Sequence, residues 1–196
     1  MNIVDRAKNI ILTPKTEWPV IAGEEPVAGQ IVSGYVIPLA LIPAVATMLG
    51  YGLVGRGMFT SFSMGIALAI VSFVVAVAGV YLTAFVIDYL APNFGSQKNF
   101  GRSMQLVAYS YTPAWVAGIL TIIPVLGVLV LIASLYGLYI LYLGFPHTMK
   151  TPQDKVVSYM VVSIIVLIIV YFVLTAILTM IVLGIFGLSA MSMMGS

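Results

Sequence analysis

The sequence predicts an all-α fold, a polytopic bundle of transmembrane helices that crosses the membrane about five times. Of its 196 residues, 62% are hydrophobic and only 7% are charged, against roughly 25% charged in a soluble domain. Apolar runs long enough to cross a hydrocarbon layer of ~30 Å recur along the chain. So few charges cannot cover a water-soluble fold, and we therefore expect lipid to surround most of this protein.

The segment before the first span, residues 1–29, is expected to be cytoplasmic and to begin with a short amphipathic helix over 1–12. Apolar side chains recur there with the helical period of about 3.6 residues, and Pro14 should end the helix. One hypothesis places this helix in the membrane interface, with Trp18 as an aromatic anchor. The alternative is that it packs against the cytoplasmic ends of the spans. The residues expected to meet the lipid surface are Ile3, Val4, Arg6, Lys8, Ile10, Ile11 and Trp18.

Five hydrophobic segments follow, each bounded by polar residues or by proline and glycine. Pro38 and Pro43 are expected to kink or partly unwind the first of them. No charge separates the third and fourth segments, so a tight helical hairpin is predicted at Pro124, with one long kinked helix as the alternative. The last segment is longer than the hydrocarbon layer, and we expect it to tilt or to extend beyond it. The transmembrane domain covers 30–188 and the tail 189–196, with spans at about 30–54, 63–90, 104–123, 125–145 and 156–188.

Lysine and arginine residues sort to one side of these spans. Three precede the first span, two follow the second and two follow the fourth, whereas Arg56 stands alone on the other side, which makes seven against one. Positively charged loops remain in the cytoplasm. The sequence therefore predicts a cytoplasmic N-terminus and a C-terminus on the opposite side of the membrane.

Asp88 is the acidic residue that lies inside an apolar run. An ionisable side chain within a span is costly to bury, and it marks a functional hypothesis by default. Asp88 also precedes Pro92 by only four residues, close to the cytoplasmic end, where Lys98 or Arg102 would be within reach. We expect structural pairing there, and a role in transport or proton relay is the alternative.

Hydroxyl and aromatic side chains are dense in the third and fourth spans. A buried tyrosine needs a hydrogen-bond partner for its hydroxyl group. These side chains would therefore either line a polar groove for a lipid headgroup or a small solute, or form interhelical hydrogen bonds that hold the bundle together. The candidate groove residues are Asp88, Gln105, Tyr109, Tyr111, Tyr136 and Tyr139.

The sequence lacks the residue groups that most enzyme classes require. It has no cysteine and a single histidine, His147, with one acidic residue nearby, so we expect no metal site and no cofactor. No glycine-rich phosphate loop is present, and no second carboxylate lies within a span. The net charge of +2, without a contiguous basic patch, argues against nucleic-acid binding. We therefore expect no catalytic residues and no enzymatic activity.

Six short stretches of the chain, in order, carry a resemblance: RAKNIILTP (6–14), EWP (17–19), LAPNFG (90–95), YSYTPAWVAGIL (109–120), YGLY (136–139) and LGFPHTMKTP (143–152). In these stretches the chain resembles the Yip1 family, and in particular its short bacterial members. The resemblance implies five spans with a cytoplasmic N-terminus, located for bacterial members in the inner (cytoplasmic) membrane, but no established chemistry. Eukaryotic members act in membrane traffic with Rab-type GTPases, and this chain lacks their Asp-Leu-Tyr-Gly-Pro motif.

Together these features favour a multi-pass inner-membrane protein that organises the membrane or binds lipid or another protein. The expected partners are membrane lipids, with a protein partner or a second copy of the chain as further candidates. The alternative is a small oligomeric transporter or channel built on Asp88 and the tyrosine-rich third and fourth spans. Five spans are few for a monomeric transporter, so that alternative requires an oligomer.

Overall fold

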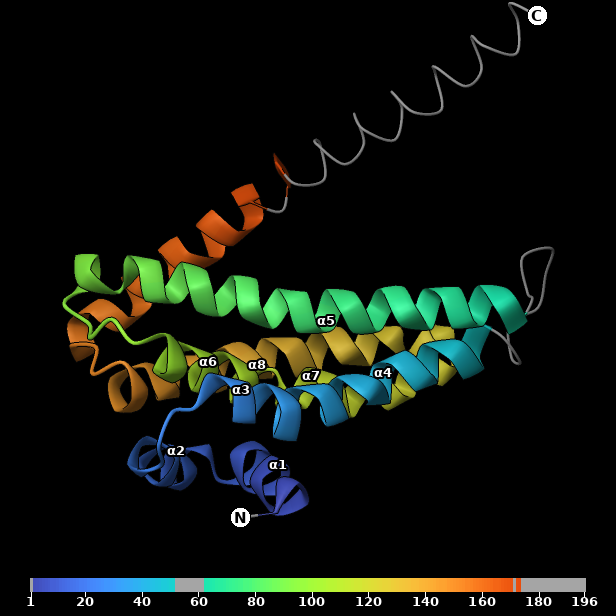
Figure 1. Cartoon of the computed structure of the whole chain (residues 1–196), viewed down its shortest axis with the longest axis horizontal. Coiled ribbons are helices and arrows are strands. Elements are labelled where there is room, and N and C mark those ends of the chain that lie inside the picture. The colour runs from blue at the N-terminus through green and yellow to red at the C-terminus, as the bar shows by residue number, and fades with distance from the viewer. Residues whose placement is uncertain (1, 52–61, 171, 174–196) are drawn as a thin grey trace, which may run out of the picture.

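The structure is a computed structural model that describes residues 2–51, 62–170 and 172–173. Every regular element in these residues is a helix (Figure 1), which confirms the predicted all-α class. Within the described residues, four helical stretches are long and apolar enough to cross a membrane. They are Ala28–Leu49, Gly65–Phe94, Gly127–Thr148 and Gln153–Val170.

The N-terminal segment folds into two short helices, α1 (Ile3–Leu12) and α2 (Pro14–Gly23). Asn2 begins α1 by accepting a 2.7 Å hydrogen bond from the Val4 N–H at its side-chain oxygen. Pro14 ends α1, as predicted, and also begins α2, because a proline at the first helical position loses no helical hydrogen bond. The second helix was not predicted from the sequence. Figure 1 shows the pair beside the bundle, next to the start of the first long helix.

The first long helical stretch is irregular just before Pro38. It begins as α3 (Ala28–Ile31), widens into a π-helical turn (Val32–Val36) and continues as α4 (Ile37–Leu49). A proline lacks the N–H that would bond to the preceding turn, and its ring crowds that turn, which favours a local widening. Pro43 is accommodated inside α4. The expected partial unwinding is therefore one wide turn, and residues 52–54 of the predicted span lie outside the described residues.

The second long helix, α5 (Phe62–Leu90), is followed by a 3₁₀ turn (Ala91–Phe94) that ends at Gly95. Gly95 has a φ of 67°, a left-handed conformation that glycine adopts without steric cost. The chain then reverses direction and enters the next helix. The predicted end of this span at residue 90 therefore coincides with the end of α5.

The segment of the predicted third span, 104–123, is not one continuous helix. The segment consists of α6 (Phe100–Ser110), α7 (Thr112–Ala117) and a 3₁₀ turn (Gly118–Ile122). Pro113 lies at the second position of α7 and cannot donate to the α6 ladder, so the helix breaks at Tyr111.

The broken segment nevertheless runs alongside the first long stretch, in the same direction, over most of its length. A Cβ atom added to Gly101 would lie 1.9 Å from the carbonyl oxygen of Pro26. One added to Gly118 would lie 2.7 Å from Pro43, and one added to Gly50 would lie 2.7 Å from the Thr121 carbonyl oxygen. These glycines let the two segments approach closely enough for backbone contact.

The chain reverses again between α7 and α8 (Gly127–Thr148), through a 3₁₀ turn (Pro124–Leu126). Both α6 and α7 contact α8. The two segments therefore pack side by side as a hairpin with its turn at Pro124, and the alternative of one long kinked helix is wrong.

The last described helix covers residues 156–170 and follows a 3₁₀ turn (Gln153–Lys155). Figure 1 shows it crossing α5 and leaning away from the other helices. Val156 and Tyr159, in its first two turns, are fully buried. The predicted continuation of this span towards residue 188 and the tail 189–196 lie outside the described residues.

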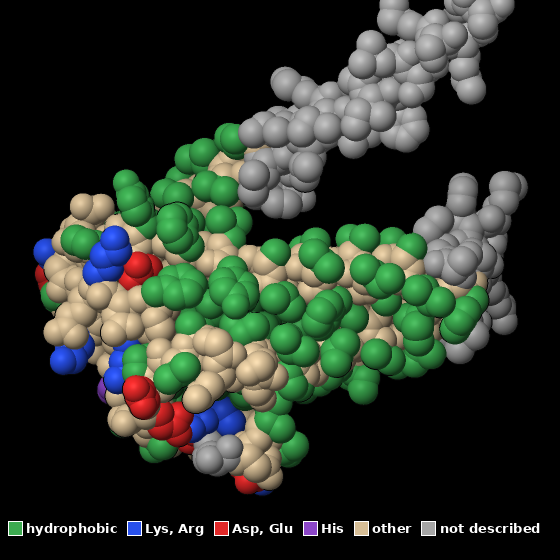
Figure 2. Space-filling view, in the orientation of Figure 1, with side chains coloured by type: hydrophobic (Ala, Val, Ile, Leu, Met, Phe, Trp, Pro, Cys, Tyr) green, Lys and Arg blue, Asp and Glu red, His purple; other side chains and the backbone are tan. Residues whose placement is uncertain are grey.

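One end of the bundle carries charged side chains from the turns after α5 and after α8, and we call it the polar end. The turns after α5 and after α8 meet there, since the Gln97 N–H donates to the Met149 carbonyl oxygen at 2.9 Å. The hydroxyl oxygens of Ser96 and Thr151 are 2.8 Å apart. In Figure 2 the charged side chains gather at this end and around α1 and α2, whereas hydrophobic side chains cover the rest of the face.

Candidate functional site

Trp18 fastens α2 to the bundle. Its side chain is fully buried, and the indole Nε1–H donates a 3.0 Å hydrogen bond to the carbonyl oxygen of Ile140 in α8. The ring lies over Gly144, where an added Cβ would be 2.6 Å from Cζ2 of the indole. The sequence-based expectation of an aromatic anchor in the membrane interface is therefore wrong for Trp18.

Arg6 joins α1 to α2 through two carboxylates. Its Nη1 lies 2.5 Å from Oε1 of Glu17, and its Nη2 pairs with Glu24. The guanidinium carbon also lies 5.5 Å from the centre of the Tyr109 ring, in a cation–π arrangement. With 5% of its surface exposed, Arg6 does not face a lipid surface, which corrects the prediction, and the buried side chain of Ile10 corrects it in the same way.

The outer face of α1 is exposed. Val4 and Leu12 are each 67% exposed, and Lys8 between them is exposed as well. These three residues are spaced four apart and form one stripe along the helix. Ile3 and Ile11 are half-buried at the edges of this stripe. Two aliphatic side chains with a lysine between them are typical of a helix that meets the membrane interface.

A cluster of hydroxyl groups lies beneath Arg6. The Thr112 hydroxyl donates to the carbonyl oxygen of Tyr109 at 2.7 Å. Its proton is therefore engaged, and the Tyr35 hydroxyl, 2.8 Å away, donates to Thr112. The rings of Tyr35 and Tyr109 meet edge to face, with their centres 4.6 Å apart. The cluster connects the first stretch to the broken third segment without an unpaired hydroxyl on Tyr35 or Thr112.

A polar hollow of about 280 Å³ opens beside this cluster, and we call it the N-terminal hollow. Ile3 lies at its edge, and Tyr35 and Ile31 lie in its wall. Glu25 is exposed, whereas Gln105 is almost fully buried. The polar residues around it are Arg6, Glu24, Glu25, Gln30, Gln105 and Tyr109.

An apolar groove of about 470 Å³ runs along the other side of α1, and we call it the α1–α4 groove. Its walls come from α1, from Pro38 and Ile42 of α4, and from Val116 of α7. Lys8 is the charged residue on this groove. A further apolar hollow of about 370 Å³ continues from Pro38 and Ile42 past Val45 to Ile119. The two cavities thus form one apolar path along α4.

The structure does not bring the predicted groove residues together in one place. Gln105 and Tyr109 line the N-terminal hollow. Tyr111 lies 2.9 Å from the Thr83 hydroxyl of α5, and the Tyr136 hydroxyl donates to the Ile11 carbonyl oxygen at 2.7 Å. Tyr139 is 42% exposed. Two of the tyrosines therefore form hydrogen bonds between helical segments, which is one of the two roles predicted from the sequence for these side chains.

Asp88 lies apart from these groups, near the polar end of α5. Its side chain is buried, and its Oδ1 atom has no hydrogen-bond partner among the described residues. The expected pairing with Lys98 or Arg102 is not formed, since both ion pairs within the described residues belong to Arg6. Arg102 instead donates to Gln105 at 2.9 Å. Within the same residues, no group of three histidine, aspartate or glutamate side chains lies close enough to hold a metal ion.

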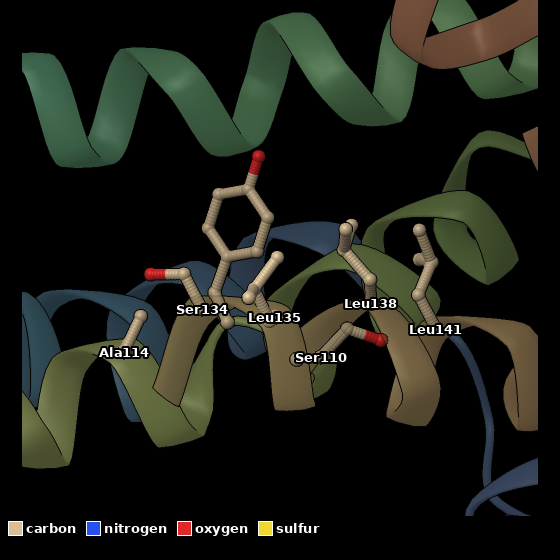
Figure 3. A pocket seen from close by; sticks show the side chains of 8 residues that line it. Ser110, Ala114, Ser134, Leu135, Leu138 and Leu141 are labelled. Carbon is tan, nitrogen blue, oxygen red and sulfur yellow. The ribbon is translucent and has the colours of Figure 1, made fainter. Parts of the chain in front are cut away.

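A separate cavity, of about 350 Å³, lies between α6, α7 and α8. Figure 3 shows Leu135, Leu138 and Leu141 of α8 around it, together with Ser110 and Ala114. The Ser110 hydroxyl is buried and has no partner in the described part of the chain. This cavity is mostly apolar, and of the hydroxyl-bearing residues that line it (Ser110, Tyr111 and Ser134) only Ser110 has an unpartnered hydroxyl group in the described part of the chain.

Several membrane-length apolar helices, packed around a hydrophobic core and polar at one end, define a polytopic α-helical membrane protein. No solved structure matches the chain. The Yip1 domain matches residues 8–177, which is most of the sequence, and the chain therefore belongs to the Yip1 family.

Two curated relatives are similar to this chain over part of its length. Both are called inner membrane protein YohC, one from Escherichia coli K12 and one from an Escherichia coli strain of serotype O6:H1. Each is 26% identical over 118 residues, which cover 57% of this chain and 60% of the relative. The match thus spans about three fifths of each relative's length. This chain is a distant homologue of a protein of the bacterial inner membrane.

Proposed function

We propose that this protein is a five-span scaffold of the inner membrane that binds lipid or a protein partner and catalyses no reaction. Its N-terminus is cytoplasmic and its C-terminus lies on the opposite side. The observation that carries the proposal is the rigid attachment of α1, whose inner face is buried through Arg6 and Ile10 and whose outer face exposes Val4, Lys8 and Leu12.

The course of the broken third segment supports five crossings. Residues 100–122 run beside 26–50 in the same direction, so both segments traverse the same thickness of the bundle. Breaks in a helix are tolerated at membrane depth where the freed backbone is buried in protein, and Thr112 and Pro113 at this break are buried. The turns on either side of this hairpin meet at the polar end, which carries Lys98 and Lys150. That charge favours a cytoplasmic position for the polar end.

The stripe on α1 supports contact with the membrane surface. Valine and leucine side chains insert at the boundary between headgroups and acyl chains, while a lysine between them extends its charge towards the headgroups. Basic residues close to the surface also attract anionic lipid, at about 1 kcal/mol each. Arg6 holds α1 to α2, and Trp18 holds α2 to α8. Contact of α1 with the membrane surface is therefore coupled to the position of the bundle.

The surface contact is tested with single cysteines, since the chain has none of its own. Val4→Cys and Thr16→Cys each receive an environment-sensitive fluorophore in full-length protein reconstituted into liposomes. Both positions are exposed, but only Val4 belongs to the stripe. We expect lipid-borne quenchers to act on the label at position 4 and aqueous quenchers to act on that at position 16. Equal access of the aqueous quencher to both labels would contradict the proposal.

Scaffolding is tested by energy transfer between labelled copies in proteoliposomes with and without phosphatidylglycerol. We expect clustering to increase with the anionic lipid and to fall in the double variant Val4→Glu, Leu12→Glu. Thr16→Glu, which adds a carboxylate outside the stripe, serves as the control. Truncation of α1 is a poorer test, because it would leave Glu17 buried without Arg6. Energy transfer that depends on neither lipid nor stripe would refute the scaffold.

A second candidate function, a small oligomeric transporter or channel, is favoured by the unpartnered Oδ1 of Asp88. A buried carboxylate without a partner is costly within a membrane and recurs in ion and proton pathways. The test is Asp88→Asn in liposomes loaded with pH- and ion-sensitive dyes. Flux in the wild type that the substitution abolishes would favour the transporter. Wild-type liposomes that pass no ion would leave the scaffold as the better account.

A further inference from the structure

We propose that the N-terminal hollow and the α1–α4 groove together bind one phospholipid whose headgroup ends in a primary ammonium, of the phosphatidylethanolamine type. The inference deepens the proposed function and depends on it only for the position of α1 at the membrane surface. It names a site and a class of lipid, whereas the scaffold requires only contact with the bilayer.

The shape of the two cavities fits one amphiphile. Ile3 lines both the N-terminal hollow and the α1–α4 groove, so a polar space and an apolar space meet at this side chain. The apolar space then continues from Pro38 and Ile42 to Val45, which is 47% exposed. A headgroup in the hollow would thus leave an acyl chain along α4 that ends among lipid-facing side chains. A water-soluble ligand would gain no favourable contact from the apolar space.

The charges around the hollow select a cation. Glu24 and Glu25 line it with Arg6, two carboxylates against one guanidinium. The charge of Arg6 is already engaged by Glu24, by Glu17 and by the Tyr109 ring, so it is not available to an anion. Glu25 is exposed and enters no ion pair in the described part of the chain. The hollow therefore repels a phosphate and attracts an ammonium group.

The hydrogen-bonding groups favour a primary ammonium over a quaternary one. A primary ammonium donates three hydrogen bonds, and the exposed side chains of Glu25 and Gln30 line the hollow and carry acceptor oxygens. The Oε1 atom of Gln105 already accepts from Arg102, so we assign the ammonium to Glu25 and Gln30. A choline group has no N–H to donate. The phosphate of the lipid would lie outside the hollow, towards Lys8, which lines the groove on the next part of α1. The two cavities thus match the order of groups in the lipid, from ammonium to phosphate to acyl chain.

The experiment measures which lipid stays bound to the purified full-length protein. The protein is exchanged into nanodiscs with equal parts of phosphatidylethanolamine, phosphatidylcholine and phosphatidylglycerol, extracted into mild detergent and analysed by native mass spectrometry. We expect one phosphatidylethanolamine to be retained over the other two lipids. Glu25→Gln should reduce this selectivity on the order of tenfold, as expected for a hydrogen bond to a charged group. Val116→Trp, which fills the groove, should reduce retention of every lipid.

Two control variants distinguish changes at the lipid site from general effects of losing a carboxylate or adding an indole. Asp154→Asn removes an exposed carboxylate at the polar end away from the hollow, and Leu131→Trp adds an indole at a position on α8 that is 66% exposed. Both should retain the lipid as the wild type does. If Val116→Trp fails to fold, Ile42→Phe narrows the same groove. Equal retention of the three lipids, or selectivity that survives Glu25→Gln, overturns the inference. Neither result depends on whether the protein clusters, so the scaffold is judged separately.

Discussion

The indole nitrogen of Trp18 lies 3.0 Å from the carbonyl oxygen of Ile140, a hydrogen bond between residues 122 positions apart in the chain. The bond connects the short helix before the first span to the middle of α8, and the indole is fully buried where it forms. Close approach is possible because Gly144 has no side chain at the point where the ring crosses α8. This contact turns the N-terminal segment into part of the bundle.

Replacement of Trp18 by phenylalanine should destabilise the protein by about 1–3 kcal/mol, since the hydrogen bond is lost and a small cavity is left. The measurement is unfolding of the detergent-solubilised protein, with limited proteolysis of residues 2–23 as a local probe. Trp115→Phe is the control, because Trp115 is also buried but its indole makes no hydrogen bond within the described residues. Equal losses in the two variants would show that only ring volume matters at Trp18.

Replacement of Gly144 by alanine should detach α2 from α8. The added Cβ would lie 2.5 Å from Leu106 and 2.6 Å from the Trp18 ring, and neither distance is tolerated without displacement. Overpacking of this kind costs about 1–3 kcal/mol. At Gly79 nothing lies within 4 Å of the added Cβ, so Gly79→Ala should be neutral or stabilise α5 by up to about 1 kcal/mol. Unfolding of both variants by heat in the same detergent provides the comparison, and similar shifts would be contrary to expectation.

Removal of Arg6 alone should destabilise the protein more than removal of both Arg6 and Glu17. Arg6→Met leaves the carboxylate of Glu17 buried without its partner, which costs about 3–5 kcal/mol in buried pairs. The double variant Arg6→Met, Glu17→Met replaces the pair by apolar side chains and should recover most of this loss. A double-mutant cycle, measured by unfolding in detergent, gives the coupling energy. Additive losses would indicate that the two side chains do not depend on each other.

The turn before α8 should be accessible only from the side opposite the polar end. Val125 is 82% exposed at this turn, so Val125→Cys should react with an impermeant maleimide added outside the cell. Asp154→Cys, at the polar end, should react only after the membrane is opened. This expectation depends on the proposed crossing of residues 100–122, whose helices are broken. Labelling of both positions from the same side would contradict five crossings.

Much of the bundle could be predicted because composition and hydropathy are local properties. The long apolar runs around α5 and α8 follow directly from the length needed to cross hydrocarbon. The turn at Pro124 and the irregular turn before Pro38 were also predictable, because proline constrains the residues next to it. The break at Tyr111 was missed, although Pro113 marked it, since the hydrophobic run continues through it unchanged.

The N-terminal contacts were not predictable in the same way. A tryptophan and an arginine near an amphipathic helix have the same sequence pattern whether they face lipid or protein. Arg6 and Glu17 are 11 residues apart across a turn, a spacing with no local signal. The sequence did leave packing against the spans open as an alternative, and the buried positions of Arg6 and Trp18 decide in its favour for those side chains.

The sequence by itself determined that this protein is a helical membrane protein of the Yip1 family. The lengths of the apolar runs, the positions of the prolines and the family motifs are all properties of the sequence alone. Only the tertiary structure decided which polar groups meet. It separated the tyrosines into hydrogen bonds between helices, left Asp88 apart from them, and gathered Arg6, Glu24 and Gln105 around one hollow. The reason is physical: a periodic pattern fixes which face of a helix is apolar, but the partner of that face is fixed by packing between segments distant in the chain.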